Sequence, residues 1–147
     1  MSLIEQFQFN FLDDSRWQFI VSGLKNTIII TFFAVLLGVF LGFLIAIVRS
    51  THDKTGKLKI LNVICRVYLT VIRGTPTMVQ LLIVYYVIFA TVDPGKVIVA
   101  IIAFGMNSAA YVAEIVRSGI MSIDQGQFEA GRSLGLNYTQ TMTKIIL

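Results

Sequence analysis

The residues best suited to chemistry in this chain lie in an apolar stretch around residue 110. Its polar residues recur at intervals of four, three and four, and so share one face of a helix: Asn107, Tyr111, Glu114 and Ser118. Polar groups inside a membrane helix are costly and face a pore, a partner helix or a water-filled cavity. We hypothesise that amide and hydroxyl groups from this stretch and from a second apolar stretch line a pathway for a polar solute: Gln80, Tyr86, Asn107, Ser108 and Tyr111.

Each of these residues also has a structural interpretation. The polar side chains can instead form hydrogen bonds between packed helices, worth about 0.6 kcal/mol each on average. Glu114 lies three residues before Arg117, a spacing that allows an ion pair within one helix, although Glu114 would equally suit a cationic substrate on the pathway. Adjacent Tyr85 and Tyr86 diverge by about 100° on a helix, so one can face the pathway while the other faces lipid.

Several kinds of active site are excluded by the sequence. A single cysteine, Cys65, and a single histidine, His52, rule out a disulfide framework and a histidine-rich metal centre. The Gly-x-x-x-x-Gly-Lys-[Ser/Thr] loop is absent, so the chain cannot bind ATP through a P-loop. We therefore expect no enzymatic activity and no cofactor in this chain. Basic residues flank apolar segments, which argues against nucleic acid as a partner.

The composition is that of an all-α integral membrane protein. Hydrophobic residues make up 56% of the chain and charged residues 14%, whereas soluble proteins average about 25% charged residues. We predict an external, interfacial lead at 1–26 and a partial transmembrane domain at 27–147. Within this domain we expect three spans, at 27–48, 76–92 and 97–116, and an amphipathic interfacial helix at 58–73.

The charges predict the orientation. Arg49, Lys54, Lys57 and Lys59 form a basic loop after the first span, and basic loops stay in the cytoplasm. The N-terminus is then outside. The 1–26 lead has no basic start before an apolar core, so it is not a cleavable signal peptide. The basic stripe of the 58–73 helix suits interfacial anchoring or, alternatively, a contact with another subunit.

Small residues recur every fourth position in the first span: Ala34, Gly38, Gly42 and Ala46. Such a groove is where membrane helices approach each other closely, so this span is predicted to have a partner helix.

A helix break is predicted at Arg73-Gly74-Thr75-Pro76. Proline disfavours a helical residue before it and suits the first position of a new helix. We therefore expect one helix to end near Gly74 and another to begin at Pro76, with Thr75 as its cap.

A short polar helix is predicted at 124–134, after the third span. The Ser-x-x-Gln pattern at 122–125 is typical of a capping box, and Gly135 suits the left-handed turn after a helix. Glu129 and Arg132 can fix the register of a docked protein, and Ala130 and Gly131 leave room for its backbone.

This loop resembles the cytoplasmic loop of ABC importer permease subunits, whose pattern is Glu-Ala-Ala, three residues, Gly, nine residues, Ile-x-Leu-Pro. The chain reads Glu129-Ala130-Gly131, then Gly135, then Ile145-Ile146-Leu147. Gly131 replaces the second Ala, and the closing Pro is absent because the sequence stops one residue earlier. Arg-Gly-Thr-Pro followed by a Gln and a Tyr pair, within 73–86, is similar to the polar amino-acid branch of the histidine, glutamine and arginine type.

The resemblance implies a type I importer permease of five or more spans in a bacterial cytoplasmic (inner) membrane, of which this chain is an N-terminal fragment. The 124–134 helix would be the coupling helix, docked on an ABC ATPase subunit that carries ATP and Mg. Other implied partners are a second permease subunit, an extracytoplasmic substrate-binding protein, a polar amino acid and membrane lipid. We expect the first span's groove and the third span's polar face to lack partners in such a fragment. Two other classes stay open, an ion-gradient-driven carrier or channel and a non-transporting membrane scaffold.

Overall fold

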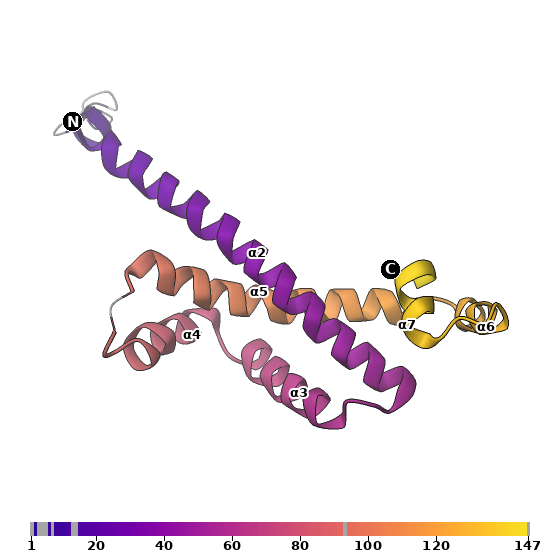
Figure 1. Ribbon diagram of the computed structural model, residues 1–147. Helices are drawn as coiled ribbons and strands as arrows, with labels where there is room; N and C mark the ends of the chain where they lie inside the picture. Colours follow the sequence, from indigo (N-terminus) through magenta and orange to yellow (C-terminus); the bar gives the residue numbers. More distant parts are fainter. Residues whose placement is uncertain (1, 3–5, 7, 13–14, 93, 147) are drawn as a thin grey trace.

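The computed structural model describes residues 2, 6, 8–12, 15–92 and 94–146, and residues 1, 3–5, 7 and 13–14 of the predicted lead lie outside this part. The regular structure of the described residues is entirely helical, which confirms the all-α fold class. Its elements, of which those labelled η are π-helical, are η1 (Gln8–Leu12), α2 (Trp17–Thr55), α3 (Lys59–Gly74), α4 (Thr77–Ile83), η3 (Val84–Ile88), α5 (Lys96–Met121), α6 (Gln125–Ser133), α7 (Tyr138–Thr141) and η4 (Met142–Ile146) (Figure 1).

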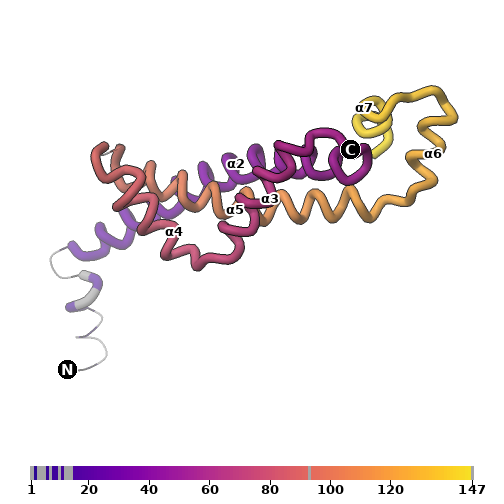
Figure 2. Tube along the Cα trace, turned by 90° about the horizontal axis from the view of Figure 1, so that it is seen from below, coloured from indigo at the N-terminus to yellow at the C-terminus, as the bar shows by residue number. Residues whose placement is uncertain are grey.

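Helices α2 and α5 make the most extensive contact of the fold and cross each other at an angle, so that the N-terminal half of α2 diverges from α5 (Figure 1 and Figure 2). The small residues of α2 lie buried at this contact. A Cβ atom added to Gly38 would come 2.5 Å from Ser108 Oγ, and one added to Gly42 would come 2.8 Å from the carbonyl oxygen of Ala109. The predicted partner helix is therefore α5 of the same chain, and the expectation that the groove would lack a partner was wrong.

Helix α2 extends beyond the predicted span at both ends. It contains 39 residues, which at 1.5 Å per residue is about 58 Å, roughly twice the thickness of a hydrocarbon core. The predicted basic loop is helical as far as Thr55. The helix ends there because Gly56, with φ +69°, adopts the left-handed conformation. The first charged residues after the span thus mark the end of the apolar segment but leave the helix intact.

By length and composition, α2 and α5 can each cross a membrane, and a third span exists if α3 and the Thr77–Ile88 helix count as one bent unit. The bend between them is 111°. The predicted second span at 76–92 is shorter than expected, because its helix ends at Ile88. Helix α3 agrees closely with the predicted 58–73 helix.

The break itself differs by one residue from the prediction. Thr75 (φ −120°, ψ 145°) and Pro76 (φ −61°, ψ 135°) are both extended, and the helix begins at Thr77. The Thr75 hydroxyl donates to the Val71 carbonyl at 2.8 Å and does not cap α4. Two consecutive extended residues explain the sharp change of direction, because proline keeps its predecessor out of the helical region.

Helix α6 is close to the predicted 124–134 helix, but its cap is different. Asp124, and not Ser122, caps the helix by accepting a hydrogen bond from Gly126 N at 2.6 Å. The Ser122 hydroxyl instead donates to the Gly119 carbonyl. The predicted turn at Gly135 is confirmed, with φ +76° and paired bonds from Gly135 N to Arg132 O and from Leu136 N to Gly131 O.

Candidate functional site

The polar face of α5 contacts the helix break at two points. At the first, Asn107 Nδ2 donates to Gln80 Oε1 at 3.1 Å. Gln80 is 8% exposed, and its Nε2 lies 2.6 Å from the Ile72 carbonyl and 2.7 Å from the Thr75 hydroxyl. The structural interpretation of these two amides as a link between helices is thus supported by the geometry.

The second contact is an ionic cluster around Glu114. Its Oε2 accepts from Arg49 at 3.0 Å and Arg73 at 3.2 Å, and its Oε1 accepts from Arg117 at 3.2 Å. The predicted pair with Arg117 is confirmed. Arg117 also contacts Asp53 Oδ2 at 2.8 Å. A cationic solute at Glu114 would compete with three arginines that already occupy both carboxylate oxygens.

Sequence reasoning missed Arg49 and Asp53 as partners in this cluster. Arg49 lies on α2 and Arg73 at the end of α3, so two other helices are tied to one carboxylate of α5. The signal was an excess of basic residues at the ends of two apolar helices near an acid on a third.

Of the other predicted pathway residues, Tyr111 lies on this polar face of α5, whereas Ser108 and Tyr86 lie elsewhere. Ser108 lies against α2 beside Gly38. Tyr111 is half-exposed, with the Arg73 guanidinium 6.0 Å from the centre of its ring. Tyr86 is exposed and contacts Tyr85 edge to face, with ring centres 4.8 Å apart. The described residues therefore bring Gln80 together with Asn107, and leave Tyr86 and Ser108 elsewhere.

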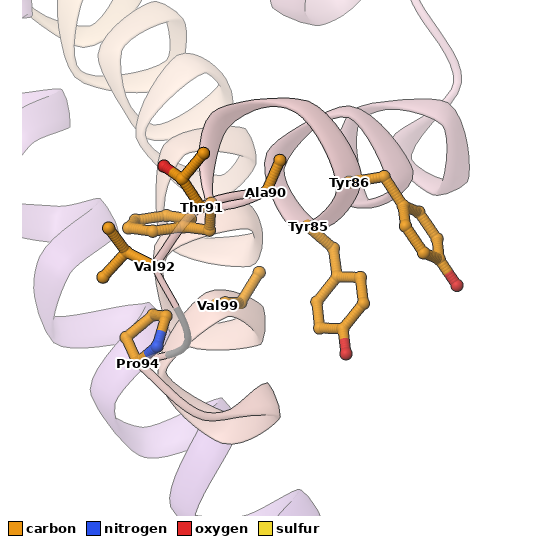
Figure 3. A pocket seen from close by; sticks show the side chains of 8 residues that line it. Tyr85, Tyr86, Ala90, Thr91, Val92, Pro94 and Val99 are labelled. Carbon is orange, nitrogen blue, oxygen red and sulfur yellow. The ribbon is translucent and has the colours of Figure 1, made fainter.

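Tyr86 lines a cavity of about 360 Å³ where η3 turns back toward α5. Figure 3 shows Tyr85 and Tyr86 projecting from η3, with Val99 on the neighbouring helix and the ring of Tyr86 pointing away from it. This cavity lies at the opposite end of α5 from α6 (Figure 2).

Three of the residues predicted for docking on α6, Glu129, Ala130 and Arg132, are exposed, and Gly131 is not. Glu129 has no salt-bridge partner within the part of the chain that the structure describes. Gly131 is buried, and a Cβ atom there would come 2.7 Å from the Thr141 side chain. We correct the prediction for Gly131, because its small size accommodates this chain's own Thr141.

Phe128 of α6 belongs to a small aromatic cluster. Phe128 stacks on Tyr138 with ring centres 6.5 Å apart, and the Lys54 ammonium lies 4.5 Å from the centre of the Phe128 ring. Arg132 lines a cavity of about 260 Å³ beside these groups. Burial raises the pKa of the Tyr138 phenol, whose buried hydroxyl has no hydrogen-bond partner in the described part of the chain. The end of α2 thus supports α6 directly.

A family model described as "Binding-protein-dependent transport system inner membrane component" matches residues 34–147. This chain belongs to that family. The match spans the α2–α5 pair, the helix break and the α6 loop, so the features built above belong to one family unit.

Relatives within this family are amino-acid permeases by name. The chain is 38% identical over 130 residues to the "Probable amino-acid ABC transporter permease protein YckA" of Bacillus subtilis, covering 88% of this chain and 55% of the relative. It is 36% identical to the "Arginine transport system permease protein ArgU" of Corynebacterium glutamicum, covering 94% and 46%. The chain spans about half the length of these curated relatives.

A solved structure shares the fold of this family member. The "Crystal structure of an amino acid ABC transporter with histidines" superimposes with a TM-score of 0.78 at 33% sequence identity, covering 100% of this chain and 64% of the other. The helical arrangement therefore corresponds to part of the longer chain in that structure.

Proposed function

We propose that this chain supplies part of the permease subunit of an ABC importer for polar amino acids, in a bacterial inner membrane. One observation carries the proposal most directly. Helix α5 is continuous from Lys96 to Met121, bears the polar face at its middle, and connects through three residues to α6, whose Glu129 is exposed. A movement of α6 is thus passed to the polar face through a rigid element.

The proposed mechanism is alternating access without covalent chemistry in this chain. The N-terminus lies outside and α6 lies in the cytoplasm, docked on a separate ATPase that holds ATP and Mg. Two permease chains enclose the pathway, and an extracytoplasmic binding protein delivers the amino acid. Glu129 contacts a basic group of the ATPase, and closure of the ATPase dimer moves α6 and with it α5. Support comes from the family, whose members serve binding-protein-dependent transport.

Charge reversal on α6 tests the coupling role. In the full-length complex, Glu129→Lys should abolish amino-acid uptake while leaving ATP hydrolysis active, because the repelled helix no longer follows the ATPase. The matched control is Gln127→Lys, which adds a cation to the same exposed helix two residues away. Coupled uptake in Glu129→Lys, or equal loss in both variants, would reject the role. Uptake without any ATPase would instead support a gradient-driven carrier.

A second substitution tests the pathway. Asn107→Leu should abolish uptake while the complex still assembles, because the amide that the solute needs is gone. Asn107 also bonds Gln80, so the thermal stability of the complex is measured in parallel to separate a structural loss from a transport loss. Unchanged uptake would remove Asn107 from the pathway.

A further inference from the structure

Helix α3 presents three distinct faces. Tyr68, Leu69 and Ile72 pack against α5. A basic stripe, Lys59, Arg66 and Arg73, recurs every seventh residue and therefore follows one side of the helix. The third face is apolar, and each of its side chains is more than half exposed: Ile60, Val63, Ile64, Val67 and Val71. At 100° per residue, the basic stripe separates the buried face from the exposed apolar face.

A cavity of about 260 Å³ lies along this stripe. It is lined by Arg66, Leu69, Thr70 and Arg73 of α3, by Arg49 of α2 and by Glu114 of α5. The cavity thus combines three guanidinium groups, one carboxylate, one hydroxyl and one apolar side chain, that of Leu69. Because Arg66 belongs to the stripe and Thr70 lies beside it on the helix, the cavity borders the exposed apolar face of α3.

The charges around this cavity do not balance. Glu114 pairs with Arg49 and Arg73, whereas Arg66 has no acidic partner among the residues that the structure describes. The Nε atom of Arg49 is buried and has no hydrogen-bond partner in the described part of the chain. Arginine presents a planar fork of donors that matches phosphate oxygens. Three guanidiniums against one carboxylate therefore favour a bound anion.

We propose that this cavity binds the phosphate headgroup of an anionic phospholipid, whose acyl chains lie along the exposed apolar face of α3. The charge complementarity identifies the headgroup, and the adjoining apolar face identifies a lipid, because a soluble anion makes no use of that face. Basic pockets between membrane helices are known to bind anionic headgroups in this manner. The proposal needs only that α3 lies at a membrane surface, so it is independent of the transported solute.

The test uses the full-length permease complex in nanodiscs of phosphatidylcholine with a minor fraction of phosphatidylglycerol. Lipid retained after detergent extraction is measured by native mass spectrometry. We expect the unmodified complex to retain phosphatidylglycerol in preference to phosphatidylcholine. Arg66→Gln should lower this retention about fivefold, the equivalent of about 1 kcal/mol for one basic residue near a lipid surface. The matched control is Lys59→Gln, which removes the same charge one heptad earlier, outside the cavity.

Three results would overturn the proposal. The first is no preference for phosphatidylglycerol in the unmodified complex, as expected if another protein segment covers α3. The second is equal retention in Arg66→Gln and Lys59→Gln, which would reduce the site to a diffuse charge effect. The third is displacement of the lipid by inorganic phosphate, which would make the ligand a free anion. Arg66→Lys keeps the charge without the fork and should give intermediate retention, so the test does not depend on one variant.

Discussion

The contact between α2 and α5 allows a matched test of the packing that organises this fold. Gly42 and Gly23 both lie within α2, but a Cβ atom at Gly42 would come 2.7 Å from Val112 Cβ and 2.8 Å from the Ala109 carbonyl oxygen, whereas one at Gly23 meets nothing within 4 Å. Substituting each by alanine adds the same methyl group to the same helix. The backbone oxygen at Gly42 cannot rotate away, so the two helices must separate.

The magnitude follows from two opposing terms. Replacing glycine by alanine in a helix interior is favourable by about 0.5–1 kcal/mol, and this term is common to both variants. Overpacking of a well-packed contact costs about 1–3 kcal/mol. Gly42→Ala should therefore be less stable than Gly23→Ala by about 1–3 kcal/mol, which corresponds to about a 5- to 150-fold difference in the unfolding equilibrium constant.

The measurement is a denaturant titration of the full-length permease in detergent micelles, monitored by helix content. Gly23→Ala should be as stable as the unmodified protein or slightly more stable. Equal midpoints for Gly42→Ala and Gly23→Ala would show that the helices are not in close contact at Gly42, and would refute the packing described above.

Three further predictions use the same titration. Glu114→Gln removes the anion shared by three arginines and should lower the free energy of unfolding by about 1.5–3 kcal/mol; an unchanged midpoint would contradict the cluster. Gln80→Leu leaves the Asn107 amide unpaired and should cost about 1–3 kcal/mol, whereas a neutral effect would mean that the link is absent. Burial raises the pKa of Tyr138, so its contribution to the free energy of unfolding is complete below pH about 10 and is lost as the pH rises further. Tyr138→Phe should remove that loss, and an identical pH profile would exclude Tyr138 as its source.

Features encoded by local patterns were predictable from the sequence. The small residues of α2, the break near Pro76 and the turn at Gly135 each depend on a few adjacent residues whose backbone preferences are strong. The spacing of the family-like motif, from Glu129 through Gly135 to Leu147, could also be recognised from the sequence without knowledge of tertiary contacts. These signals located the elements to within a few residues.

Contacts between helices distant in sequence were not predictable. The pairs Arg49–Glu114 and Asp53–Arg117 span 65 and 64 residues. Their formation depends on how α2 and α5 are rotated about their axes, which periodicity within one helix does not specify. The same ambiguity affects Ser108, which follows Asn107 yet lies against α2, because one residue along a helix changes direction by about 100°.

Capping also depended on geometry that sequence patterns leave open. Ser122 and Asp124 are both good caps by residue type, and the structure uses Asp124 because α5 remains helical to Met121 and engages the Ser122 hydroxyl. At Thr75, the hydroxyl bonds back to the preceding helix, which competes with capping the next one.

Residues on both sides of the helix break bind α5, and these contacts restrict the angle at the break. Arg73 before the bend binds Glu114, and Gln80 after it binds Asn107. The two anchor residues on α5 are seven positions apart, about 10 Å along the axis, so α3, α4 and α5 form a triangular frame. Any change in the 111° angle at the break must stretch either the Arg73–Glu114 ion pair or the Asn107–Gln80 hydrogen bond. These two contacts therefore hold the angle between the helices fixed, and a change in the angle requires one of them to be replaced by another contact.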